Sequence, residues 1–207
     1  MFDLLTRSPR TRKPVTRSVS LCLERLEDRL SPTGGMEMLG MNVTYVQNKQ
    51  VTLAGSLSSP SGPVTNQTIN FGGVVKGTAT TDAQGNYSVT LTASALGQVT
   101  AASADGLSNQ ATYTLVGGTP VINNFTAIPE GGGLWEFSGN VTGAPAQGEV
   151  VNFGGIPALE NQSRNVQPDG TFSFFVVVAS GQGGVATAQA VDWWGDTSKV
   201  AMTGVLA

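Results

Sequence analysis

The sequence predicts an all-β chain in which two copies of one antiparallel β-sandwich follow each other. The main observation is an internal repeat, because three segments of the first half recur in the same order in the second. They are VTLAGSL at Val51–Leu57 and WEFSGNV at Trp135–Val141, INFGG at Ile69–Gly73 and VNFGG at Val151–Gly155, and TTDAQGNYSVTL at Thr80–Leu91 and NVQPDGTFSFFV at Asn165–Val176. The other observations are a two-residue alternation of apolar and polar side chains and closely spaced turn residues, which together indicate short strands.

The spacing of the repeat predicts the domain organisation. The aligned pairs Gly55/Gly139, Phe71/Phe153 and Tyr87/Phe172 are 84, 82 and 85 positions apart, so the offset changes only by loop-sized steps. We therefore expect a first domain over 38–116, a linker over 117–119 and a second domain over 120–207. Residues 1–37 are expected to be an N-terminal targeting segment and linker, largely disordered apart from a short amphipathic helix.

Within each copy, large side chains alternate along the expected strands. Val51 and Leu53 alternate with smaller or polar neighbours, and the second copy keeps the same parity from Trp135 onward. DAQGN at 82–86 and QPDGT at 167–171 place a glycine just before an aromatic strand, where a positive φ costs little. The strands expected in the first copy are 41–47, 50–57, 67–71, 74–80, 85–93, 98–104 and 110–116.

The composition excludes several classes of function. Among 207 residues there are 27 glycines and 12% charged side chains, which suits short strands and tight turns. The chain has no histidine, which excludes a Ser-His-Asp triad and removes the commonest transition-metal ligand. The single cysteine, Cys22, lies outside both copies, so neither copy can hold a disulfide of its own. Glu136 and Glu149 are not repeated as a carboxylate pair in the first copy, and we expect no enzyme activity, no cofactor and no metal.

Charge divides the chain into two parts. Residues 1–30 carry seven Lys or Arg and four Asp or Glu, a net +3, while the remainder carries four and ten, a net −6, which together give the chain's −3. A mildly acidic body argues against nucleic acid as a partner. No stretch approaches 18 consecutive apolar residues, so no transmembrane segment is predicted.

The basic N-terminal part has helical periodicity over Ser18–Leu30. Its motif consists of Leu23, Glu24, Arg25, Leu26, Glu27, Asp28 and Arg29. This run resembles the LE(D/P)R-type motif near the N-termini of large exported bacterial surface proteins. The resemblance implies export or surface display, and the alternative is a short amphipathic helix with no such role.

A second resemblance covers most of the remaining chain. In the first copy it rests on Thr81, Asp82, Gly85 and Tyr87 and on Val99–Ala101, and in the second on Pro168, Asp169, Gly170 and Phe172 and on AVDWWGDTS at Ala190–Ser198. These segments resemble the bacterial Ig-like repeats of adhesins and invasins. The resemblance implies Ig-like sandwiches that act as spacers, adhesins or accessory modules of exported enzymes.

The second copy departs from this pattern at Trp193 and Trp194, which we predict to be the ligand-binding site together with Asp192 and Asp196. Adjacent residues of a strand point in opposite directions, so one tryptophan should be partly exposed. An exposed indole beside acidic groups suits stacking on a sugar ring or a protein contact. The alternative is that one tryptophan packs at the domain junction and the other caps the sandwich.

Calcium is a second open alternative. Five aspartates lie near predicted turns, namely Asp82, Asp105, Asp169, Asp192 and Asp196. Calcium binds oxygen ligands from loops, but aspartate is also an ordinary turn residue. The turn interpretation needs no ion and is the simpler of the two.

Taken together, these features predict a non-enzymatic exported or cell-surface module, structural or adhesive, built from two Ig-like repeats. Its partner would be a cell-surface protein or a glycan. The alternative is a carbohydrate-binding accessory module that uses Trp193 and Trp194.

Overall fold

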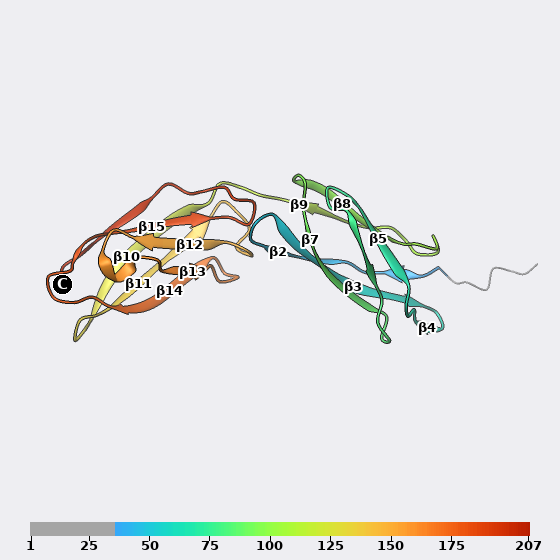
Figure 1. The fold of residues 1–207 in the computed structure, drawn as a ribbon, viewed down its shortest axis with the longest axis horizontal. Helices are drawn as coiled ribbons and strands as arrows, with labels where there is room; N and C mark the ends of the chain where they lie inside the picture. Colours follow the sequence, from blue (N-terminus) through green and yellow to red (C-terminus); the bar gives the residue numbers. More distant parts are fainter. Residues whose placement is uncertain (1–35) are drawn as a thin grey trace, which may run out of the picture. The chain divides into compact units, whose positions relative to one another are not determined.

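Nine antiparallel strands form the first sandwich in the computed structural model, which describes residues 36–207. Its two sheets are shown in Figure 1. One sheet contains β1 (Met38–Leu39), β2 (Asn42–Val46), β3 (Gln50–Ser59), β4 (Gly62–Pro63) and β7 (Asn86–Thr92). The other, in the order β6-β5-β8-β9, contains β5 (Thr68–Gly73), β6 (Gly77–Thr80), β8 (Gly97–Ser103) and β9 (Ala111–Leu115).

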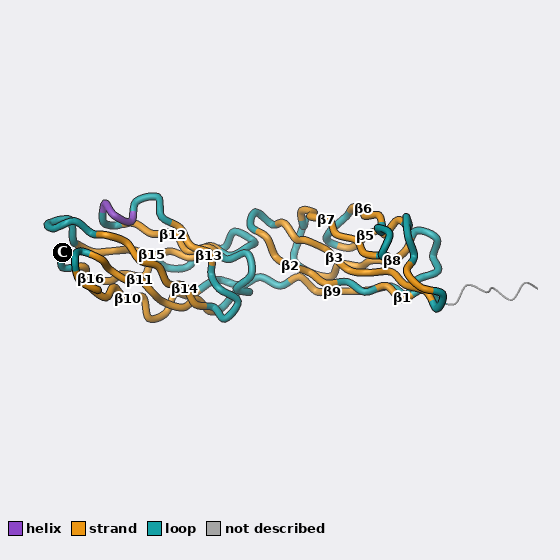
Figure 2. Tube along the Cα trace, turned by 90° about the horizontal axis from the view of Figure 1, so that it is seen from below, coloured by secondary structure: helices purple, strands orange, loops and turns teal. Residues whose placement is uncertain are grey.

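Seven antiparallel strands form the second sandwich. Its three-stranded sheet, in the order β10-β11-β14, contains β10 (Val121–Gly131), β11 (Leu134–Thr142) and β14 (Thr171–Val177). Its four-stranded sheet, in the order β13-β12-β15-β16, contains β12 (Val150–Gly154), β13 (Ser163–Asn165), β15 (Gly184–Val191) and β16 (Ala201–Val205). Figure 2 shows strands along most of the trace, and the purple segment is η2, a 3₁₀ turn over Pro157–Leu159 that begins with a proline.

The two sandwiches share one strand order, and residues aligned in the sequence occupy matching positions. Gly55 of β3 pairs with Tyr87 of β7, just as Gly139 of β11 pairs with Phe172 of β14. In both copies the chain crosses between the sheets at corresponding places, as in an Ig-like sandwich. The predicted fold class, an all-β chain of Ig-like antiparallel sandwiches, is therefore confirmed.

The alternation of side chains places a separate hydrophobic core in each sandwich. Val51 and Leu53 are fully buried in the first core, and Phe137 occupies the corresponding place in the second. The second core is the more aromatic of the two, since it contains Phe125, Trp135, Phe137, Phe153, Phe172 and Phe174. The predicted strands match the observed ones closely, but the two-residue strands β1 and β4 were missed because so short a segment carries no readable period.

One polar group in the first core distinguishes the two copies. The Tyr87 hydroxyl donates a hydrogen bond of 2.7 Å to the Gly40 carbonyl, and the side chain is 4% exposed. Burial raises the pKa of Tyr87 to about 12. The second copy has Phe172 at this position and needs no such bond.

We expect Tyr87→Phe to lower the free energy of unfolding by about 1 kcal/mol near neutral pH, because it removes one hydrogen bond from a buried carbonyl. Since the folded-state pKa lies above the ordinary value of 10.0, the unfolded chain loses this proton first as the pH rises. Wild-type stability should therefore fall through the window from pH 10 to 12 more steeply than that of the variant. Urea unfolding at a series of pH values measures this difference, and identical slopes for the two proteins would contradict it.

The motif residues Leu23, Glu24, Leu26, Glu27, Asp28 and Arg29 and the expected amphipathic helix lie outside the described residues. Within residues 36–207, no helix has the length and apolar character needed to cross a membrane.

Candidate functional site

The predicted site lies in the turn that connects β15 to β16. Asp192 organises this turn, because its Oδ1 accepts hydrogen bonds of 2.7 Å from the backbone N–H groups of both Gly195 and Asp196. The carboxylate of Asp196 is exposed. Asp105 has the same role in the first copy, where its Oδ1 accepts from the backbone N–H of Leu107 at 3.0 Å.

Trp193 and Trp194 belong to an insertion in this turn. In the first copy, Ser108 Oγ accepts from the backbone N–H of Ser103, five residues away. In the second, Ser198 Oγ accepts from the backbone N–H of Ala190, eight residues away. The two serine bonds close equivalent turns, so the second turn is three residues longer and has room for the tryptophan pair.

The inserted turn places Trp193 in the core cluster of the first sandwich. Its side chain is 0% exposed, and its indole Nε1 donates a hydrogen bond of 2.9 Å to the Val116 carbonyl. Its ring centroid lies 4.5 Å from that of Tyr45, whose hydroxyl accepts a 3.1 Å hydrogen bond from the Val116 N–H. A further backbone bond of 2.9 Å runs from the Lys49 N–H to the Trp193 carbonyl. A residue of the second copy thus completes the core of the first.

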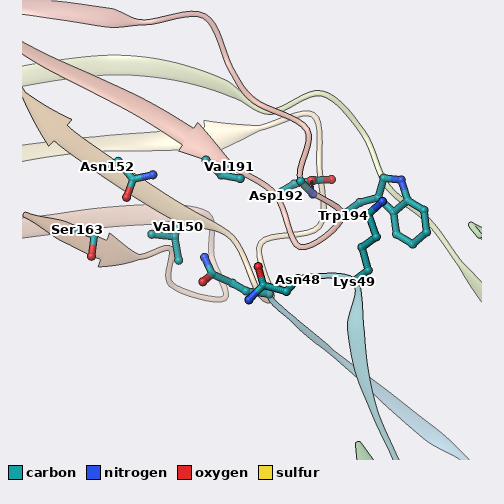
Figure 3. A pocket seen from close by; sticks show the side chains of 10 residues that line it. Asn48, Lys49, Val150, Asn152, Ser163, Val191, Asp192 and Trp194 are labelled. Carbon is teal, nitrogen blue, oxygen red and sulfur yellow. Dashed lines mark hydrogen bonds between the residues drawn. The ribbon is translucent and has the colours of Figure 1, made fainter. Parts of the chain in front are cut away.

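Trp194 is half-buried, so the expectation that one of the two adjacent tryptophans is partly exposed is met. Its ring meets that of Trp193 edge-on, with centroids 5.4 Å apart. Figure 3 shows the Lys49 side chain extending to Trp194, where its Nζ lies over the ring. The Nζ is 4.6 Å from the ring centroid. A cavity of about 590 Å³ opens beside these two side chains, with Asn48, Asn152 and Ser163 on its wall.

Sequence reasoning missed a buried carboxylate beside this turn. Val150 of β12 pairs with Val191 of β15, so the next residues along the two strands, Glu149 and Asp192, lie opposite one another. Glu149 is 1% exposed and Asp192 is 2% exposed. Burial, and then the charge of Asp192, raises the pKa of Glu149 to about 7. The alignment of the two copies could have revealed this pair. Glu149 aligns with Gln67, so the second copy has a carboxylate where the first has an amide, at a position opposite the turn aspartate.

The carboxylate pair considered in the sequence, Glu136 with Glu149, is not formed. Glu136 lies on β11, where its Oε1 accepts a hydrogen bond of 2.6 Å from Ser173 Oγ of β14. Glu149 precedes β12, which belongs to the other sheet of the same sandwich. The two residues are therefore held in different layers of the sandwich.

The remaining turn aspartates cap their own turns. Asp82 Oδ1 accepts from the backbone N–H groups of Gln84 and Asn86, and Asp169 Oδ1 accepts from that of Thr171. Hydrogen bonds of this kind lower the pKa of Asp169. No three His, Cys, Asp or Glu side chains within residues 36–207 gather as a metal-binding group.

The fold and this junction define a protein of Ig-like sandwiches. No family model matches the chain, and no curated protein does. Among solved structures, the D0–D1 domain of intimin is similar at 14% identity and a TM-score of 0.28, over 82% of this chain and 97% of that one. Invasin, a bacterial integrin-binding protein, is similar at 20% identity and a TM-score of 0.30, over 80% of this chain and 38% of that one. A β-glycosidase from Bacteroides vulgatus is similar at 10% identity and a TM-score of 0.28, over 82% of this chain and 25% of that one. TM-scores this low assign neither a family nor a function.

Proposed function

We propose that the chain is a non-enzymatic structural and adhesive module of an exported or cell-surface bacterial protein. The observation that supports this most is the burial of Trp193, because the most distinctive residue of the second sandwich is used to join it to the first. The proposed domains are 38–116 and 120–207, with 117–119 as the linker and 1–37 as the targeting segment. A joined pair of sandwiches suits a spacer or display role, whose mechanism is passive.

An adhesive role would use the outer face of the β10-β11-β14 sheet. Leu134 pairs with Val177 and lies near Phe175, and these side chains are 36%, 66% and 56% exposed. Contiguous apolar side chains on an exposed sheet face are typical of protein–protein contacts. The class of ligand that fits this face is a protein surface.

The carbohydrate-binding alternative is not favoured. Stacking on a sugar requires an accessible face of an indole ring, and Trp193 is 0% exposed. Trp194 has one side against Trp193 and has Lys49 over its ring. The pair is thus engaged in contacts within the chain.

The structural part of the proposal is tested by backbone ¹⁵N relaxation on the full chain. If Trp193 joins the sandwiches, amides of both should report one rotational correlation time, because they tumble together. Trp194→Ala is the control and should leave the single value unchanged. Two independent correlation times in the wild-type protein would contradict the proposal.

Export is tested separately by fractionating the native cells and measuring the intact mass of the protein. We expect the chain in the envelope or the medium, and removal of about the first 30 residues would identify them as a leader. A full-length protein confined to the cytosol would contradict export, and the basic N-terminal segment would then be a candidate docking element.

A further inference from the structure

Glu149 and Asp192 form a buried acidic pair that the turn and the sandwich fold do not require. Their positions continue the antiparallel register of Val150 with Val191, so both side chains follow the parity of Val151 and Ala190, which are fully buried. Both carboxylates therefore point toward the core side of their sheet, at its end. Asp192 uses only Oδ1 to organise its turn.

Three oxygens of this pair have no hydrogen-bond partner. They are Oε1 and Oε2 of Glu149 and Oδ2 of Asp192, all buried from solvent among residues 36–207. A buried carboxylate with no donor is costly unless a proton or a cation neutralises it. Lys49 is the cationic side chain on the wall of the cavity that Asp192 also lines. Its Nζ, however, lies over the Trp194 ring.

The available donor atoms select a hard cation. The chain has no histidine, and its single cysteine lies at position 22, so oxygen is the ligand type that this part of the chain offers. A second cavity, of about 450 Å³, has Glu149 in its wall together with Gln47, Gln147 and Asn165, whose side chains carry amide oxygens. Calcium accepts six to eight such oxygens in flexible geometry, whereas magnesium demands a near-ideal octahedron.

The first copy provides an internal comparison. Gln67 takes the place of Glu149, because the backbone N–H of Thr81 donates to the Gln67 carbonyl as that of Val166 does to the Glu149 carbonyl, both at 3.0 Å. The fold thus accepts a neutral amide at this register position. The first copy has a different buried acid near its turn aspartate, Glu37, which precedes β1 and has one unpartnered oxygen instead of two.

The acidic pair is directly connected to the tryptophan that joins the two copies. Asp192 immediately precedes Trp193, and Glu149 immediately follows Gly148. A Cβ placed on Gly148 would lie 2.9 Å from Trp193 Cβ and 3.1 Å from the Tyr45 carbonyl oxygen, so these backbones are in close contact. An ion held by the two carboxylates would therefore fix both sides of the Trp193 contact.

From this arrangement, we propose that Glu149 and Asp192 bind a Ca²⁺ ion that stabilises the Trp193 junction. The two carboxylates supply the three free oxygens, and amide oxygens and water complete the shell. The ion has no part in a reaction. This proposal concerns the junction alone and stands whether or not the chain is exported.

The test is a Tb³⁺ titration of the metal-stripped full chain at about pH 7.5, because a lanthanide bound here would be sensitised by the adjacent indole of Trp193. We expect Tb³⁺ emission that added Ca²⁺ displaces, and a rise in Tm of about 5 °C in about 2 mM Ca²⁺, the shift expected when the ion exceeds its Kd roughly a hundredfold. Glu149→Gln and Asp192→Asn should each weaken Tb³⁺ binding at least about tenfold. Gln67 indicates that Glu149→Gln is compatible with the fold, and Asp192→Asn retains the Oδ1 that organises the turn.

Glu37→Gln is the matched control, since it removes a buried acid beside the other turn aspartate and should leave Tb³⁺ binding unchanged. Two results would overturn the proposal. One is the absence of sensitised emission together with a Tm that does not respond to Ca²⁺. The other is Tb³⁺ binding that Glu149→Gln and Asp192→Asn leave intact, which would place the ion elsewhere.

Discussion

Trp193→Ala is expected to lower the free energy of unfolding by about 3–5 kcal/mol, the usual cost of truncating a buried tryptophan. The side chain is 0% exposed, packs on Tyr45 at 4.5 Å and donates to the Val116 carbonyl at 2.9 Å, so its removal leaves both a cavity and an unpaired carbonyl. Because these contacts join the two copies, the loss should also separate their unfolding transitions. Scanning calorimetry measures both effects, and one transition should become two.

Trp194→Ala is the matched control for this prediction. Trp194 is only half-buried, and its Lys49 contact is a cation–π interaction at the edge of a cavity, so truncation should cost about 1 kcal/mol. It should leave a single transition. Equal losses for the two variants, or a single transition in Trp193→Ala, would contradict the assigned role of Trp193.

The tryptophan pair marks the limit of what the sequence could predict about the site. One of the two adjacent indoles is partly exposed, as predicted, but the prediction assumed a strand, and both residues lie in the turn that follows β15. The sequence also did not indicate which indole would be buried, or that it would enter the core of the other copy. That outcome depends on contacts of Trp193 with Val116 and Tyr45, from separate segments of the first sandwich, and no local period encodes them. Whether the four residues Asp192, Trp193, Trp194 and Asp196 bind a ligand stays a prediction.

The fold was predictable because the sequence contains two copies of it, so each long strand expected in one copy was supported by an aligned strand in the other. Phe71 and Phe153 align in sequence and pair with Ala101 and Ala188 at corresponding positions of their sheets. Elements without such support were missed. The 3₁₀ turn at Pro157–Leu159 occurs only in the second copy, where the connection from β12 to β13 is longer than that from β5 to β6.

The aligned glycines Gly55 and Gly139 lead to the last prediction. Gly55→Ala should lower the free energy of unfolding by about 3 kcal/mol, the upper end for overpacking, because the new Cβ would overlap the Gly40 carbonyl oxygen. That oxygen also accepts the Tyr87 hydrogen bond, so neither group can yield without breaking it. Gly139→Ala should cost less, about 1–2 kcal/mol. The atom nearest to its new Cβ, at 2.7 Å, would be at the end of the Phe172 ring, and a side chain can shift more easily than backbone.

Urea unfolding of the two variants compares these costs, and the Tyr87→Phe background separates their causes. Removing the hydroxyl takes away one contact of the new Cβ, at 2.8 Å, but leaves the Gly40 backbone in place. Gly55→Ala should therefore remain costly in that background. If Tyr87→Phe fully restored the stability lost in Gly55→Ala, the hydroxyl and not the Gly40 backbone would be what requires glycine at position 55. Equal stability losses for Gly139→Ala and Gly55→Ala would contradict the expectation that overlap with backbone costs more than overlap with a ring. In each copy the repeated glycine is thus explained by the close approach of backbone from the preceding segment. In the first copy this is Gly40, between β1 and β2, and in the second it is Asn123 of β10, whose carbonyl oxygen would lie 3.2 Å from the Cβ added to Gly139.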